Sequence, residues 1–116
     1  MAEITLADAQ QLVDDWINRL GVRYFSELTN LAQLTEEVGE LARILSRRFG
    51  DQSAKPGEKL GDAGDELADV LFVTICLANQ MGINLTEAFE RNLVKKTVRD
   101  HDRHRNNPKL YDDDRR

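Results

Sequence analysis

The chain has 116 residues, of which 41% are hydrophobic and 32% are charged, a composition typical of one globular domain rather than a disordered segment. Its formal net charge of −5 argues against a protein that binds the backbone of a nucleic acid, because such proteins normally carry a dominant basic face. The N-terminal sequence MAEITLADAQ has no basic start followed by an apolar core, and no apolar run approaches the roughly 18 residues of a membrane span. We therefore expect a cytoplasmic protein that binds neither a nucleic-acid polymer nor a membrane.

Apolar residues recur at helical rather than strand spacing, which predicts an all-α fold that resembles a four-helix bundle. The first helix is expected from about Leu6 to Leu20, where Gly21 supplies a left-handed stop. The second is expected over residues 26–49, with Ser26 as the N-cap and Gly50 as the stop. Its predicted core stripe consists of Leu31, Leu34, Val38, Leu41 and Leu45.

The third helix is expected from about Glu58 to Met81, with Gly82 as its stop. Its middle part, DVLFVTICLA, is apolar nearly all round, which predicts a central position or a subunit interface. Cys76 lies in this run and is expected to be buried rather than reactive. The fourth helix opens at Asn84 and fades near Arg99.

Residues 1–105 are expected to form one domain, followed by a polar, flexible tail over residues 106–116. So small a chain with helices so apolar cannot cover all of its large side chains alone. We therefore expect a homo-oligomer that forms through the second and third helices.

The stretch LTEEVGELARIL is helical in pattern yet carries three carboxylates, on Glu36, Glu37 and Glu40, close together on one side. Like charges at this spacing destabilise a helix by roughly 0.2–0.5 kcal/mol per pair. Only Glu40 has a basic residue, Arg43, within reach. This local cost indicates that the carboxylates serve a purpose beyond helix formation.

A second acidic stripe, with Glu66 and Asp69 at its end, opens the third helix. A short connection makes the second and third helices antiparallel neighbours, so the two groups of carboxylates can face each other. Facing carboxylates cannot all stay ionised without a countercharge. An all-oxygen set without His or Cys suits Mg²⁺, with Mn²⁺ as an alternative. On this evidence a metal site and an ordinary solvated acidic surface are equally good interpretations.

The two motifs, in this order and in these apolar contexts, resemble those of the MazG-like nucleotide pyrophosphohydrolases, in particular the short, single-domain YpjD-type members. The E-x-x-E…E-x-x-D signature of the family reads Glu37-x-x-Glu40 and Glu66-x-x-Asp69 in this chain, with Glu36 as the preceding acid. The resemblance covers nearly the whole chain. It implies an all-α enzyme that hydrolyses nucleoside triphosphates between the α and β phosphates with Mg²⁺, as housecleaning of non-canonical or surplus nucleotides, and that forms dimers or tetramers.

The resemblance also implies roles for individual residues. It assigns the metal to Glu37, Glu40, Glu66 and Asp69. It makes Glu36 and Glu37 the candidates for the catalytic base, without deciding between them. It implies that phosphates are held by residues of the last helix, namely Asn92, Lys95, Lys96 and Arg99.

Aromatic residues early in the chain, Trp16, Tyr24 and Phe25, could stack on a nucleobase, although ordinary packing is the more frequent role of such residues. Two other functions remain open. The chain could be an acidic helical module that binds a basic partner without catalysis, or a non-catalytic regulator that binds metal.

Overall fold

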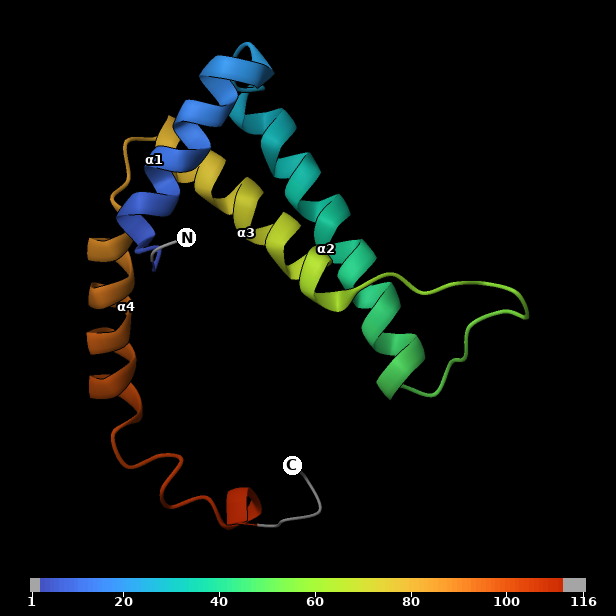
Figure 1. The fold of residues 1–116 in the computed structure, drawn as a ribbon. Coiled ribbons are helices and arrows are strands. Elements are labelled where there is room, and N and C mark those ends of the chain that lie inside the picture. The colour runs from blue at the N-terminus through green and yellow to red at the C-terminus, as the bar shows by residue number, and fades with distance from the viewer. Residues whose placement is uncertain (1–2, 112–116) are drawn as a thin grey trace. The chain divides into compact units, whose positions relative to one another are not determined.

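The computed structural model describes residues 3–111, and within that range the chain is helical with no strand (Figure 1). The α-helices are α1 (Leu6–Trp16), α2 (Glu27–Phe49), α3 (Ala63–Gln80) and α4 (Leu85–Asp100). A π-helical turn covers Ile17–Gly21, and a 3-10 helix covers Pro108–Tyr111. The predicted all-α class with four main helices is confirmed.

The chain divides into two compact units, Met1–Asn84 and Leu85–Arg116. The first unit contains α1, α2 and α3, and the second contains α4 and the segment that follows it. Over residues 3–111, no single helix is long and apolar enough to cross a membrane, and α3 and α4 meet that requirement of length and composition only when they are counted together.

Side-chain caps begin the helices of the first unit. The Thr5 hydroxyl accepts a hydrogen bond from the Asp8 backbone N–H, and the Asp8 carboxylate accepts one from Thr5, which completes a capping box at 3.0 Å on both sides. Ser26 accepts from the Thr29 N–H and caps α2, as predicted. Gly50 is the C-cap of the same helix, as predicted.

The start of α3 differs from the prediction, because the helix begins at Ala63 and not near Glu58. Asp62 is the N-cap, and its carboxylate accepts a hydrogen bond from the Gly64 N–H at 2.8 Å. Glu58 is held elsewhere, since its carboxylate accepts from the Lys55 N–H and pairs with Arg43 at 2.8 Å. These two local interactions keep the residues before Asp62 out of the helix.

The end of the first helix also differs from the prediction. The α-helix stops at Trp16 and continues as the π-helical turn, and the positive φ of 73° falls on Val22 rather than on Gly21. A β-branched residue in this conformation is strained. By contrast, Gly82 takes a φ of 67° just after α3, at the position where the sequence predicted the stop.

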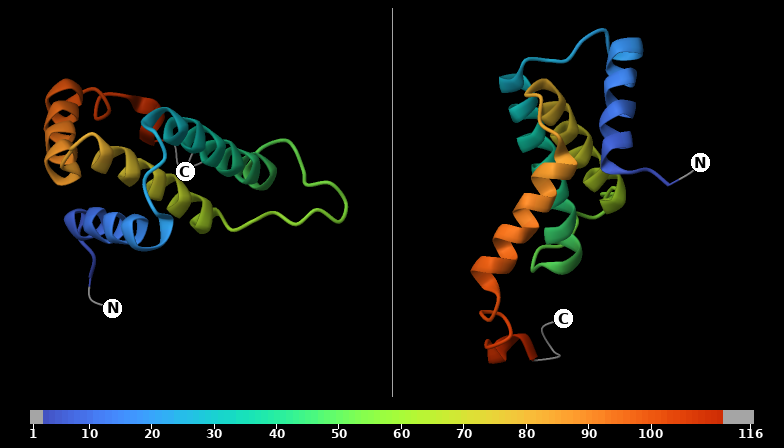
Figure 2. Two further views of the ribbon diagram at one scale, coloured as in Figure 1. Left: turned by 90° about the horizontal axis from the view of Figure 1, so that it is seen from above. Right: turned by 90° about the vertical axis from the view of Figure 1, so that its left-hand side faces the viewer.

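α3 is the central helix of the first unit, as its apolar sequence predicted. It packs along α2 on one side and against α1 on another (Figures 1 and 2). The buried apolar residues of the unit are Val13, Ile17, Ile44, Val73, Ile75, Cys76 and Ala78. Cys76 is 3% exposed, which confirms that it is a buried packing residue.

The predicted core stripe of α2 is partly wrong. Leu34 and Leu41 are half-buried, but Leu31, Val38 and Leu45 are 51%, 47% and 39% exposed. The side of α2 that is buried in the chain passes through Asn30 and Ile44, because α3 contacts the helix along that line. The remaining apolar stripe is open to solvent in the single chain.

The second unit is described by itself. Phe89 and Leu93 on α4 are 55% and 48% exposed in the single chain. After α4, the Tyr111 hydroxyl donates to the Arg105 carbonyl at 2.9 Å. Within the tail predicted over residues 106–116, Pro108–Tyr111 form the 3-10 helix, and residues 112–116 lie outside the described range. The flexibility of this tail remains a prediction.

Candidate active site

Three carboxylates from two helices meet in the first unit and form the acidic cluster of Glu37, Glu66 and Asp69. One carboxylate oxygen from each lies within 4.8 Å of the other two. Glu66 and Asp69 share a face of α3 because they are three residues apart, and Glu37 faces them from α2. The packing of α2 along α3 thus brings parts of both predicted acidic motifs together.

The surroundings of the acidic cluster disfavour three free negative charges. Desolvation, followed by the charges of Asp69 and Glu66, raises the pKa of Glu37 above its ordinary value. The Oε2 atom of Glu66 is buried and has no hydrogen-bond partner within residues 3–111. In the same range, no Lys, Arg or His forms an ion pair with any of the three.

This donor set fits a hard divalent cation. Oxygen-only ligands suit Mg²⁺ and Mn²⁺, and a cation would supply the partner that the buried Glu66 oxygen lacks. It would also offset the desolvation and the repulsion by Asp69 and Glu66 that together raise the pKa of Glu37.

The other two predicted acids of α2 lie outside the acidic cluster. Glu36 is exposed, and the carboxylate of Glu40 is 3.8 Å from the Arg43 guanidinium with 56% of its side chain exposed. Successive residues of an α-helix point about 100° apart, so Glu36 does not share the direction of Glu37. Glu40 is three residues from Glu37 and lies nearer to its side of α2, but its carboxylate is directed to Arg43. The roles predicted for Glu36 and Glu40 remain predictions.

The predicted phosphate-binding residues lie on α4, in the second unit. Lys96 donates a hydrogen bond to the Asn92 side chain, so these two share a face of the helix as expected for residues four apart. Arg99 is paired with Asp100 at 2.9 Å, and Lys95 is exposed. Their part in phosphate binding likewise remains a prediction.

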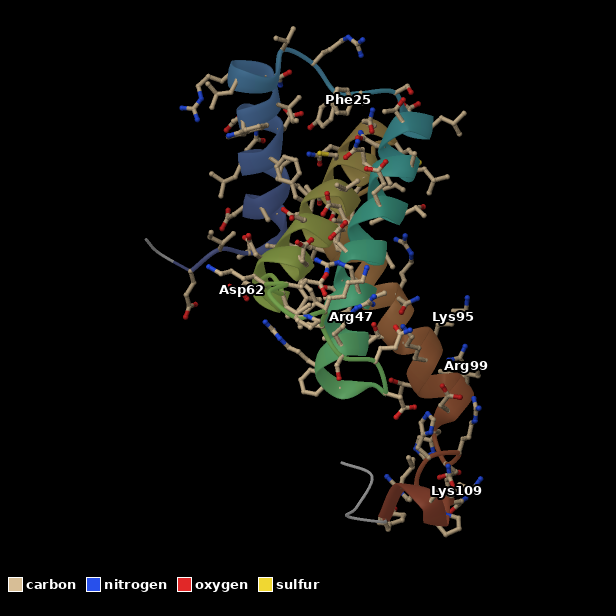
Figure 3. The ribbon with its side chains drawn as sticks, turned by 90° about the vertical axis from the view of Figure 1, so that its right-hand side faces the viewer. Phe25, Arg47, Asp62, Lys95, Arg99 and Lys109 are labelled. Carbon is tan, nitrogen blue, oxygen red and sulfur yellow. The ribbon has the colours of Figure 1, made fainter. Side chains whose placement is uncertain are left out.

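A cavity of about 340 Å³ adjoins the acidic cluster, and we call it the aromatic cavity. Glu37 and Asp69 belong to its lining. Its aromatic lining residues are Trp16, Tyr24, Phe25 and Phe72. Figure 3 shows that Phe25 lies at one end of the α2–α3 pair, whereas Asp62 and Arg47 lie toward the other. A volume near the lower end of the range for small-molecule sites suits a single nucleobase.

The aromatic side chains combine packing with open surface. Trp16 meets Phe72 edge to face, with ring centroids 5.7 Å apart, yet it remains 45% exposed. The Tyr24 hydroxyl donates to Asp14 at 2.6 Å and accepts from Asn79 at 3.0 Å. Desolvation, together with the hydrogen bond to Asp14, raises the pKa of Tyr24 to about 12. The ring of Tyr24 is thus held in a fixed position in the wall of the aromatic cavity.

Asn30, Gln33 and Phe72 are among the lining residues that the sequence analysis missed. Asn30 and Gln33 lie seven and four residues before Glu37, so all three share one face of α2. That spacing could have identified Asn30 and Gln33 from the sequence as residues on the same face as Glu37. Phe72 lies three residues after Asp69 and was interpreted only as part of an apolar run.

Comparison with known proteins identifies the family. The MazG nucleotide pyrophosphohydrolase domain matches residues 25–104. The uncharacterized protein YpjD of Bacillus subtilis is 44% identical over 103 residues, which are 89% of this chain and 93% of that protein. A crystal structure of YpjD from Bacillus subtilis superimposes with a TM-score of 0.72 at 43% identity, over 82% of this chain and 97% of that one.

A second solved structure carries a stated activity. It is the Bacillus-conserved MazG protein, described as a nucleotide pyrophosphohydrolase, with a TM-score of 0.67 at 39% identity over 82% of this chain and 91% of that one. Both structures share the helical fold and lie well above the identity at which only a fold is shared. The chain therefore belongs to the MazG family and is a hydrolase that acts on nucleotide pyrophosphate bonds.

Proposed function

We propose that the protein hydrolyses nucleoside triphosphates between the α and β phosphates, to a nucleoside monophosphate and pyrophosphate, with Mg²⁺ as the metal and Mn²⁺ as a substitute. The observation that carries this proposal is the acidic cluster, with its unpartnered Glu66 oxygen, at the edge of the aromatic cavity. One end of a nucleotide is polyanionic and the other is a flat ring, and the two parts of the site match these two ends.

Glu37, Glu66 and Asp69 would hold the cation, and Glu40 would join them if it exchanged Arg43 for the metal. A bound cation supplies charge neutralisation at the phosphates and a lower pKa for an attacking water. Glu36 and Glu37 are the candidates for accepting the proton of that water, which a carboxylate within hydrogen-bond reach can do. The net charge of −5 makes such a mediator necessary for a polyanionic substrate.

The far phosphates need further positive charge. Lys95, Lys96 and Arg99 on α4 would supply it, and Asn92 would donate a hydrogen bond. In the chain alone Lys96 bonds to Asn92 and Arg99 pairs with Asp100, so both interactions would be exchanged for phosphate oxygens.

The protein is proposed to act as a homodimer or homotetramer. The exposed apolar stripe of α2, formed by Leu31, Val38 and Leu45, exceeds what a small monomer needs to leave in water. Leu67 and Leu71 on α3 are also at least half exposed. A second copy of the chain would cover these side chains through the two helices that carry the acidic cluster. A cytoplasmic role in removing non-canonical or surplus nucleotides would suit this activity.

A product assay tests the reaction. Purified protein is incubated with Mg²⁺ or Mn²⁺ and a panel of common and modified nucleoside triphosphates, and the released monophosphate, pyrophosphate and orthophosphate are measured. We expect monophosphate and pyrophosphate, and a loss of both in Glu66→Gln. Release of orthophosphate would show that another bond is cleaved.

Thermal unfolding with and without metal separates this proposal from the two alternatives. An acidic module that binds a basic partner would show no stabilisation by Mg²⁺ and no turnover. A metal-binding regulator would be stabilised by Mg²⁺ but would turn over no triphosphate.

A further inference from the structure

The orientation of one polar side chain in the lining of the aromatic cavity, that of Asn30, is fixed by a hydrogen bond to a residue outside the lining. Asn30 is 5% exposed, and within residues 3–84 it is the polar residue that is buried. It lies on the same face of α2 as Glu37, seven residues earlier, which corresponds to about 10 Å along the helix axis. This separation leaves room for a sugar between a base near Asn30 and phosphates near the acidic cluster.

A hydrogen-bond network decides which end of the Asn30 amide faces the aromatic cavity. The Gln80 Nε2 donates to the Phe25 carbonyl and to the Glu27 carboxylate, and both of these groups can only accept. The Oε1 of Gln80 must therefore be the atom that faces Asn30. It accepts a hydrogen bond from Asn30 Nδ2 at 2.8 Å.

The Oδ1 of Asn30 is the atom of this amide that takes no part in the hydrogen bond to Gln80. Gln80 does not line the aromatic cavity, whereas Asn30 does. Because Nδ2 is bonded to Gln80, Oδ1 is the atom of the Asn30 amide that is available to a ligand in the cavity. No group within residues 3–111 donates a hydrogen bond to this oxygen. The aromatic cavity thus contains, on a residue that is 5% exposed, an acceptor that cannot rotate into a donor without breaking the bond to Gln80.

We propose that Asn30 is a specificity-determining residue, which selects nucleobases with an exocyclic amino group through this fixed acceptor. The inference rests on the proposed function and names the substrates that it prefers, cytosine and adenine nucleotides over their oxo counterparts. A carbonyl at the same position would face Oδ1 with a second acceptor and leave both without a donor, which a buried site penalises.

Gln80 acts as a positioning residue in this scheme. Loss of its amide would free Asn30 to turn over and offer its NH₂ group to an oxo base. A structural role for Gln80 alone would lower stability or activity on every substrate equally. The proposed role changes the ratio between substrates.

The test compares bases that differ only in the amino or oxo group. The ratio of kcat/KM is measured for dCTP against dUTP, and for dATP against dITP, with pyrophosphate as the detected product. We expect the protein to favour the amino member of each pair by roughly 10- to 100-fold. Asn30→Leu and Gln80→Leu should each bring both ratios within about threefold of one, and Gln52→Leu in the exposed connector should leave them unchanged.

Equal rates on amino and oxo substrates in the unaltered protein would overturn the inference. So would an active Gln80→Leu that keeps the original ratios. If Asn30→Leu does not fold, as judged by circular dichroism, Gln80→Leu decides the question.

Failure of the proposed reaction is distinguishable from failure of this inference. In that case no triphosphate releases pyrophosphate, and calorimetry with dCMP and dUMP still measures base selection. Tighter binding of dCMP, lost in Gln80→Leu, would support the role of Asn30, and equal binding of the two would exclude it.

Discussion

Glu36 and Glu37 are adjacent in the sequence, yet the two sides of α2 give them different surroundings. Glu37 is half-buried and faces Asp69 and Glu66, and desolvation followed by these two charges raises its pKa, whereas Glu36 is exposed to solvent. The same contrast separates Asn30, which is buried against Gln80, from Leu31, which is 51% exposed. At the site, the side of α2 that contacts α3 is therefore polar. Much of the apolar stripe of α2 lies on another side of the helix, where it stays exposed and available to another partner.

The largest effect is expected in the acidic cluster, where α2 and α3 meet. Glu66→Gln removes a charge from the acidic cluster, and we expect hydrolysis with Mg²⁺ to fall by about 10²–10³-fold, because several kcal/mol of charge stabilisation are lost. Asp65→Asn is the matched control on the same turn of α3, and it should retain activity within about twofold because the residue is exposed. Equal losses in the two variants, measured as pyrophosphate release, would contradict the assignment of the site.

Two exposed carboxylates of α2 that lie outside the acidic cluster are tested by Glu40→Gln and Glu36→Gln. We expect losses of about tenfold, smaller than for Glu66→Gln, because neither carboxylate lies in the acidic cluster of the chain alone. The measurement is kcat/KM over a range of Mg²⁺ concentrations. A loss in Glu40→Gln as large as that in Glu66→Gln would show that Glu40 leaves Arg43 and binds the metal directly, which would remove the contrast between the two sides.

The stability of the metal-free protein tests the same comparison of Glu37 with Glu36, and here the substitution of Glu37 is expected to cause a gain rather than a loss. The pKa of Glu37 is raised in the folded protein, so the folded state holds this proton more tightly than the unfolded state. Stability is therefore lost as the pH rises through the folded pKa. Glu37→Gln should unfold at a higher urea concentration than the unaltered protein at pH 7 in EDTA, and the difference should shrink toward pH 4. Glu36→Gln should show no such gain.

The smallest expected effect concerns the wall of the aromatic cavity. Tyr24→Phe loses the hydrogen bond to Asp14, and we expect a cost of about 1 kcal/mol in the free energy of unfolding at pH 7. Because the pKa of Tyr24 is raised to about 12, its contribution is complete below pH 10 and is lost as the pH rises from 10 to 12. Urea unfolding across this range should show a decline in the unaltered protein that Tyr24→Phe lacks. Parallel curves would contradict the role of this hydrogen bond.

Features that depend on neighbouring residues were predictable from the sequence alone. Ser26 can cap only the helix that follows it, and Gly50 could be recognised as its end. The apolar run around Cys76 identified the central helix, because a helix that is apolar all round has no face to give to water. The two acidic motifs could also be recognised as a pair, since a short connector makes α2 and α3 antiparallel neighbours.

The tertiary structure decided what depends on the direction that a helix face points. Periodicity placed Leu31, Val38 and Leu45 on one stripe correctly, but it could not say that α3 would contact the neighbouring line through Asn30 and Ile44. The difference is about one residue, or 100° of rotation, and it turns the side of α2 that carries Glu37 toward Glu66 and Asp69.

The same limit applies to the aromatic cavity, which takes its walls from α1, α2, α3 and the segment around Tyr24. The orientation of the Asn30 amide depends on Gln80, fifty residues away in the sequence. Spacing along the chain determines which residues share a helix face, because that is a property of one helix. Which faces meet depends on the packing of several helices together, and only the tertiary structure shows it.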